Sequence, residues 1–108
     1  MCTKYKILHQ TDLGYVALCE KCDHLHVEIG NFMSVLCKHS FNMILKDFQK
    51  VNKRKKELSI STPTGIKTIT RLSDNMFLSQ TPEEFEKTLK MFEVSNHMMS
   101  ACEILNHE

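Results

Sequence analysis

The chain has 108 residues, of which 42% are hydrophobic and 25% are charged, a composition typical of one globular domain. Its formal net charge of +1 does not by itself predict a nucleic-acid or membrane partner. No apolar run approaches the roughly 18 residues that a membrane span needs, and no secretory signal pattern opens the sequence, so we expect a cytoplasmic protein.

The first part of the chain predicts four short strands. Residues 5–8 and 15–18 are rich in side chains that suit a pleated surface, and Asp12-Leu13-Gly14 is the turn between them. Residues 24–29 alternate between polar and apolar side chains, which is typical of a strand with one buried face. Gly30-Asn31 is a hairpin turn signal, and residues 32–36 predict the strand that follows.

Two helices and a second hairpin follow these strands. Ser40 is predicted to cap the first helix, whose apolar residues recur at spacings of three and four along residues 41–51. Residues 58–72 predict a hairpin around Pro63-Thr64-Gly65. Thr81 followed by Pro82 and two glutamates predicts the start of a second helix, because a capping hydroxyl, an N-terminal proline and early acids all favour one. That helix is expected to reach about Leu105.

The two halves of the chain resemble each other. A shift of 44 residues (75 − 31) places Asn31 on Asn75, and the same shift places Phe41 on Phe85, Leu45 on Leu89 and Phe48 on Phe92. We predict a single domain over residues 1–108, with pseudo-repeat halves of about 14–53 and 57–105, although chance agreement among common core residues explains the match equally well. The expected fold class is α+β, with an antiparallel sheet of two hairpin–helix units and two helices packed on one face.

The cysteines leave three interpretations open. Five is an odd count, which favours reduced thiols that ligate a metal or lie in the core over a disulfide framework. Cys19-Glu-Lys-Cys22 between two strands is typical of a zinc knuckle, and a structural zinc site needs four ligands. Buried structural thiols explain the motif equally well, and a redox pair fits less well because a strand rather than a helix follows Cys22.

The predicted zinc ligands are Cys2, Cys19, Cys22 and His24, with structural zinc as the expected cofactor. Cys37, His9 and His26 are the other candidates for the ligand set. In their apolar contexts, Cys37 and Cys102 are otherwise expected to be core residues.

Motifs of catalysis are missing from the sequence. It contains no nucleophile elbow, phosphate loop or His-Glu-x-x-His pattern, and its three glycines are too few for a phosphate-cradling loop. We therefore predict that the protein is not an enzyme and has no catalytic residues.

Charge is distributed unevenly along the chain. Between residues 46 and 56 there are six bases against the single acid Asp47, and these bases are Lys46, Lys50, Lys53, Arg54, Lys55 and Lys56. They predict either a solvated helix end or contact with RNA phosphates or an acidic protein surface. Aromatic residues that would stack on bases are not interleaved with them, which weakens the case for sequence-specific RNA binding.

The last helix is acidic and has a wide apolar surface. Met91, Val94 and Met98 lie beyond its main apolar stripe, and methionine-rich surfaces of this kind adapt readily to a partner. These three residues are the predicted interface, with coverage by the N-terminal strands as the alternative.

Short motifs spread over nearly the whole chain point to a known family: Met1-Cys2, Gly14-Tyr15, Cys19-x-x-Cys22, Gly30-Asn31, Leu-Ser-Ile-Ser-Thr-Pro at residues 58–63, and the closing helix. On these motifs the chain resembles an uncharacterised domain family of short bacterial Cys-x-x-Cys proteins. That family has no assigned activity, so the resemblance implies only the fold and the grouping of Cys2, Cys19 and Cys22. Cys37 and the basic run after it depart from the family pattern.

The chain is also similar, by size and type alone, to phage-encoded anti-CRISPR proteins. We therefore expect a non-enzymatic interaction protein that binds and regulates or inhibits a nucleic-acid-handling partner, in its most specific form an RNA-guided nuclease or its guide RNA. No membrane partner is expected, and a homodimer is left open. The alternative is a zinc-stabilised housekeeping module that binds another protein.

Overall fold

The computed structural model describes residues 5–106, with side chains described through Ala101. Seven strands and three helices follow one another within these residues. In chain order they are β1 (Tyr5–Gln10), β2 (Gly14–Cys19), β3 (His24–Ile29), β4 (Phe32–Cys37), α1 (Lys38–Lys53), α2 (Lys55–Leu58), β5 (Ser59–Thr62), β6 (Gly65–Ser73), β7 (Met76–Gln80) and α3 (Pro82–Asn106).

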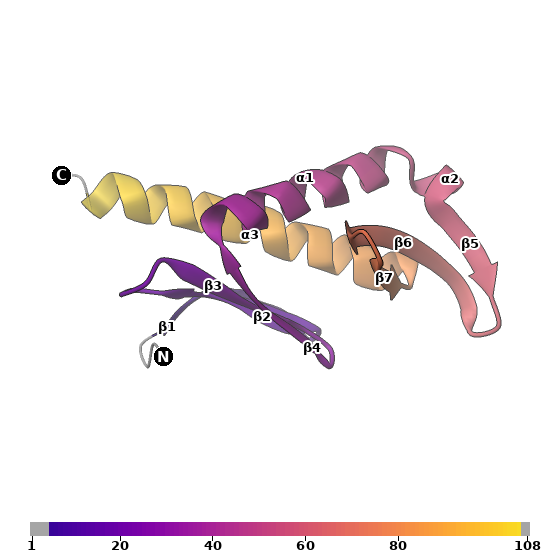
Figure 1. Cartoon of the computed structure of the whole chain (residues 1–108), viewed down its shortest axis with the longest axis horizontal. Helices are drawn as coiled ribbons and strands as arrows, with labels where there is room; N and C mark the ends of the chain where they lie inside the picture. The colour runs from indigo at the N-terminus through magenta and orange to yellow at the C-terminus, as the bar shows by residue number, and fades with distance from the viewer. Residues whose placement is uncertain (1–4, 107–108) are drawn as a thin grey trace.

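The first four strands form an antiparallel meander, sheet A, in the order β1-β2-β3-β4 (Figure 1). Val16 pairs with Val27 in the β2–β3 register, and both side chains are buried beneath the helices. Gly14 opens β2 opposite Ile29, where a Cβ atom would overlap the carbonyl oxygen of Glu28. The close approach of β2 and β3 at this point therefore requires glycine.

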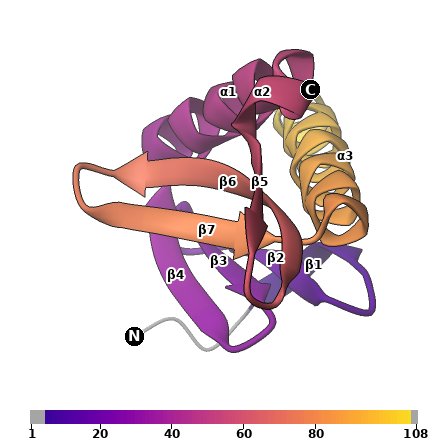
Figure 2. The same cartoon turned by 90° about the vertical axis from the view of Figure 1, so that its right-hand side faces the viewer.

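The remaining strands form a second antiparallel sheet, sheet B, in the order β5-β6-β7. The predicted α+β class is confirmed, but the strands make two sheets where the sequence predicts one. The reason is the length of α1, whose 16 residues carry the chain about 24 Å at about 1.5 Å per residue before β5 begins. Figure 1 shows β5 at the end of α1 that is remote from β4, and Figure 2 shows β6 and β7 crossing sheet A at an angle.

Helix α1 begins three residues earlier than predicted (40 − 37), because Cys37 rather than Ser40 is its N-cap. Cys37 has extended backbone dihedral angles (φ −74°, ψ 165°), and its sulfur accepts a hydrogen bond from the Ser40 amide at 3.4 Å. The helix ends at Lys53, where the Arg54 amide donates to the carbonyl of Val51 at 3.0 Å.

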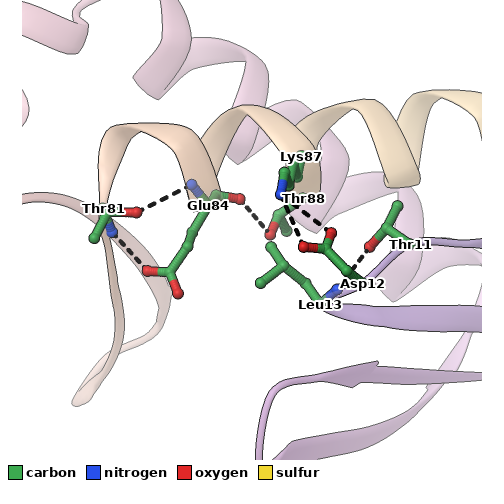
Figure 3. A network of polar contacts seen from close by, with 7 residues as sticks. All are labelled: Thr11, Asp12, Leu13, Thr81, Glu84, Lys87 and Thr88. Atoms are coloured by element: carbon green, nitrogen blue, oxygen red, sulfur yellow. Dashed lines mark hydrogen bonds and ion pairs between the residues drawn. The ribbon is translucent and has the colours of Figure 1, made fainter.

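Helix α3 begins at the predicted place (Figure 3). The amide of Glu84 donates to Thr81 Oγ1 at 3.1 Å, and the amide of Thr81 donates to Glu84 Oε1 at 2.9 Å, which is a capping box. One turn later, Lys87 Nζ contacts both carboxylate oxygens of Asp12 at 2.9 and 3.2 Å and ties α3 to the β1–β2 turn. Within residues 5–106, no helix is long and apolar enough to cross a membrane.

The core lies where α1 and α3 meet the two sheets. Four phenylalanines, two from each helix, are the largest fully buried side chains, namely Phe41, Phe48, Phe85 and Phe92. Both helices bury apolar residues at spacings of three and four, so the predicted stripe of α1 is confirmed at Phe41, Leu45, Phe48 and Val51. The two helices therefore pack over one face of each sheet.

The element bounds follow the same 44-residue shift as the sequence similarity. The shift carries Phe32, the first residue of β4, onto Met76, the first residue of β7, and it carries Lys38 at the start of α1 onto Pro82 at the start of α3. Within the predicted halves of about 14–53 and 57–105, each half thus has three antiparallel strands and ends in a long helix, and β1 lies before the first half. An origin by duplication stays a prediction, which this agreement favours.

Candidate functional site

Three lysines lie along one exposed face of α1. Lys46, Lys50 and Lys53 are spaced by four and three residues, so they share one side of the helix, and all three are exposed. They face away from the buried phenylalanine stripe, because burying that stripe turns the opposite side of α1 to solvent. Lys53 lies seven positions after Lys46, so the three lysines span about 10.5 Å at about 1.5 Å per residue. We call these three residues the lysine face.

The other three bases of the run differ in their surroundings. Arg54 donates from Nε and a terminal nitrogen to Glu57 Oε2 at 3.0 and 2.8 Å. Lys55 Nζ lies 2.6 Å from Glu86 Oε1 and 5.8 Å from the ring centroid of Phe85, so it holds α2 to α3. Lys56 is exposed. The structure thus divides the predicted set into structural ion pairs and outward-pointing lysines.

The lysine face carries unneutralised charge. In the part of the chain that the structure describes, Lys46, Lys50, Lys53 and Lys56 form no ion pair. An open hollow of about 570 Å³ lies at the end of α1, where residues 52–57 and Ser59 line it. Its wall includes Lys53 and Lys56, which form no ion pair with a described residue, beside Arg54, which is paired with the acid Glu57 of the same wall.

Sequence reasoning missed Arg71 as a neighbour of the lysine face. Arg71 and Lys50 line a second hollow of about 320 Å³ between α1 and the β6–β7 turn, together with Asp47 and Asp74. Arg71 is held there by Asp74, whose carboxylate oxygen lies 3.2 Å from it. No local pattern links residues 50 and 71, because their proximity depends on how sheet B packs against α1.

The Cys19–Cys22 turn joins β2 to β3. Cys22 donates a hydrogen bond from its thiol to Cys19 Sγ at 2.8 Å, and a ring nitrogen of His24, Nδ1, lies 2.7 Å from the carbonyl oxygen of Cys22. Cys19 is buried and disulfide-bonded, whereas Cys22 and Cys37 are exposed free thiols. The expectation that all the thiols are reduced is therefore wrong for Cys19.

The predicted zinc ligands are only partly brought together. Cys19 and Cys22 are in contact and His24 is close to them, but Cys2 lies outside the described residues. Among the residues that are described, no three His, Cys, Asp or Glu side chains form a group that could hold a metal ion. A disulfide-bonded Cys19 does not supply the thiolate that zinc binds, so these residues do not fit a zinc site in this state. The zinc site stays a prediction.

Cys37 lies at the surface, where the sequence predicts a core residue. It pairs with His24 across the β3–β4 register and caps α1. The Ser40 side chain, and then the Ser40 amide, hold the pKa of the Cys37 thiol below its usual value. The thiol donates to Ser40 Oγ at 3.3 Å, an atom that can donate in turn to the thiolate, and the sulfur accepts from the Ser40 amide at 3.4 Å. Helix capping thus produces a thiol that ionises more readily than an ordinary cysteine.

The predicted interface on α3 divides between core and surface. Met91 is fully buried, Val94 is half-buried, and Met98 is 40% exposed. Most exposed apolar side chains lie on strands instead, and they include Ile7, Met33, Val35, Ile60, Ile66 and Phe77. Met33 and Val35 alternate with half-buried neighbours along β4, a signal that the strand pattern contains but that sequence reasoning did not use.

No protein-family model, no curated protein and no solved structure matches this chain. The resemblance to the short bacterial Cys-x-x-Cys family, and the similarity of type to anti-CRISPR proteins, therefore stay predictions.

Proposed function

We propose that this chain is a small non-enzymatic protein that binds a nucleic-acid-handling partner, with the lysine face as the surface that contacts nucleic-acid phosphates. The observation that carries the proposal is the arrangement of Lys46, Lys50 and Lys53 on one exposed side of α1, free of ion pairs with any described residue. Lysines arranged in this way release counterions when they bind phosphates, which gives affinity without sequence readout.

The packing of α1 supports this role. The helix is fixed by buried Phe41 and Phe48 on its opposite side, so the lysines project from a rigid element rather than from a loop. The Lys55–Glu86 contact further holds the end of the run in place. A preorganised cationic ridge loses less conformational entropy on binding than a flexible basic tail.

A charge-reversal experiment tests the proposal. The Lys50→Glu/Lys53→Glu variant removes two members of the lysine face, and the matched control Lys21→Glu/Lys90→Glu reverses two exposed lysines elsewhere. Both variants change the net charge equally. Fluorescence anisotropy with a short single-stranded RNA, at about 50 to about 200 mM salt, measures affinity and its salt dependence.

We expect the lysine-face variant to lose affinity at least about tenfold and the control to lose less than about threefold. The slope of log affinity against log salt is expected to become less negative by about 1.4, since each single-strand phosphate contact contributes about 0.7. Equal losses in the two variants would mean that net charge alone attracts RNA, and the proposal would then be wrong.

The most specific form of the proposal is inhibition of an RNA-guided nuclease. Its test is a cleavage assay in which the chain is added to the nuclease before or after the guide RNA. Inhibition that depends on Lys50 and Lys53 supports this form, and unchanged cleavage by nucleases of the native host removes it.

A second candidate is a zinc-stabilised module that binds another protein. The exposed apolar side chains of β4, Met33 and Val35, favour it because they form part of an uncovered sheet surface. This candidate predicts one zinc ion per chain by elemental analysis, a melting temperature that falls on chelation, and partner binding that does not depend on salt.

A further inference from the structure

The Cys19–Cys22 turn contains a free thiol aimed at a disulfide sulfur. Cys19 is the last residue of β2, is fully buried and is disulfide-bonded. Cys22 carries an exposed free thiol, and its Sγ lies 2.8 Å from Cys19 Sγ. A sulfur–sulfur bond is about 2.05 Å long, so the two atoms need to approach by less than about 1 Å to become bonded.

The surrounding contacts fix Cys22 in this position. Asp23 adopts a left-handed backbone conformation (φ 57°), which reverses the chain tightly enough to bring Cys22 back toward the end of β2. The Asp23 carboxylate lies 3.5 Å from Lys38 Nζ at the start of α1. The 2.7 Å contact between His24 Nδ1 and the Cys22 carbonyl oxygen orients the backbone of Cys22 itself.

We propose that this turn is a thiol–disulfide exchange site in which Cys22 attacks Cys19. The Cys22 thiolate forms a bond to Cys19 Sγ, and the existing bond from Cys19 to its disulfide partner breaks. The electron pair of the broken bond leaves with the partner sulfur, which becomes a thiolate and takes up the proton that Cys22 has lost. The number of disulfides is unchanged, so the step requires no external oxidant or reductant.

The product and the starting state have the same number of disulfides but close different loops of the chain. A bond between Cys19 and Cys22 closes only the turn between β2 and β3. The former disulfide partner of Cys19 is then no longer linked to the end of β2. The exposed location of Cys22 also allows small thiols to reach the new bond. The site thus gives the chain two interconvertible disulfide arrangements, with Cys22 as the residue that selects between them.

Peptide mapping tests this proposal on the full chain, purified without reductant and in the presence of a chelator. Lys21 lies between the two cysteines, so trypsin separates them unless a disulfide joins the resulting peptides. Samples incubated at about pH 8 are quenched with acid and alkylated at low pH, because only the thiolate attacks. Non-reducing mass spectrometry then measures the Cys19–Cys22 linked pair over time.

Cys37→Ser is the matched control, because Cys37 is the other exposed free thiol among the described side chains and occupies the same tryptic peptide as Cys22. We expect the linked pair to accumulate in the wild type and in Cys37→Ser, faster at higher pH, and to be absent from Cys22→Ser. The proposal is overturned if the linked pair does not form in Cys37→Ser. It is also overturned if Cys19 of the purified chain is a free thiol, or if a second preparation made without chelator holds one zinc ion per chain that Cys22→Ser loses.

Discussion

The ring of Phe41 on α1 stacks on the ring of Phe92 on α3, with centroids 4.7 Å apart and planes inclined by 9°. Phe48 makes tilted contacts with Phe85 at 5.9 Å and with Phe92 at 5.0 Å. The 44-residue shift carries Phe41 onto Phe85 and Phe48 onto Phe92. It therefore carries the two rings of α1 onto the two rings of α3. The two halves therefore meet through positions that the shift makes equivalent.

Truncation of Phe92 is expected to lower the free energy of unfolding by about 3–5 kcal/mol, because it leaves a cavity beside both Phe41 and Phe48. Urea unfolding measures the change, and Phe92→Leu replaces Phe92→Ala if the latter does not fold. Phe77→Ala is the control, because Phe77 is 58% exposed, and it is expected to change stability by less than about 0.5 kcal/mol. Comparable losses at the two positions would contradict a core centred on these rings.

Removal of the α3 cap is expected to cost about 1 kcal/mol. Thr81→Ala deletes the hydroxyl that accepts from the Glu84 amide at 3.1 Å and leaves that amide without its partner in the first turn. Ser100→Ala, at an exposed position further along the same helix, is the control and is expected to be neutral. A neutral Thr81→Ala would show that tertiary packing alone determines where α3 starts.

The same cap predicts a dependence of stability on pH. Hydrogen bonding from the Thr81 amide lowers the pKa of the Glu84 carboxyl below its usual value. The carboxylate therefore stabilises the folded state above the unfolded pKa of about 4.3, and this contribution is lost as the pH falls through the lower folded pKa. Denaturant unfolding between about pH 5 and about pH 3 should show a shallower decline for Glu84→Gln than for wild type. Glu93→Gln, exposed on the same helix, should retain the wild-type decline.

Features that depend on neighbouring residues were predictable from the sequence. The α3 cap joins residues three apart, so Thr81 and Glu84 reveal it without knowledge of the fold. The α1 stripe and the alternation of β3 are equally local. The lysine face follows directly from the spacing of Lys46, Lys50 and Lys53 on that helix.

Features that depend on distant packing were not predictable. The division into two sheets follows from the path that α1 gives the chain, and the place of Arg71 beside Lys50 follows from sheet B. Cys37 sits in an apolar stretch, but the strand places it on the outward-facing positions and the helix start draws its sulfur to Ser40. Met91 was expected at an interface, but it is fully buried on α3, a helix that packs against both sheets and α1.

Two buried threonines with opposite hydrogen bonding provide a further test. Thr70 and Thr88 are both buried, but no described group hydrogen-bonds to Thr70 Oγ1. Thr88 Oγ1 donates to the Glu84 carbonyl at 2.9 Å and accepts from Gln80 Nε2 at 2.7 Å. Thr70→Val should therefore be neutral or stabilising by about 1 kcal/mol, whereas Thr88→Val should destabilise by about 1–3 kcal/mol because it strands the Gln80 amide. Thermal and urea unfolding compare the two, and loss of stability in Thr70→Val would indicate a partner such as a buried water.

The Cys37 thiol is expected to react with iodoacetamide at lower pH than a cysteine without its hydrogen bonds. The Ser40 hydroxyl is the largest cause of its lowered pKa, and the thiolate is the reactive form, so the pH profile of alkylation should shift upward in Ser40→Ala. The measurement is the alkylation rate at Cys37 in a Cys22→Ser background, which removes the other free thiol that is exposed among the side chains the structure describes. Replacement of Lys38, the residue next to Cys37, by Gln serves as a control for local charge and should move the profile less than Ser40→Ala does. An unchanged profile in Ser40→Ala would mean that the hydroxyl does not stabilise the thiolate, and the acidity of Cys37 would then rest on the Ser40 amide at the start of α1.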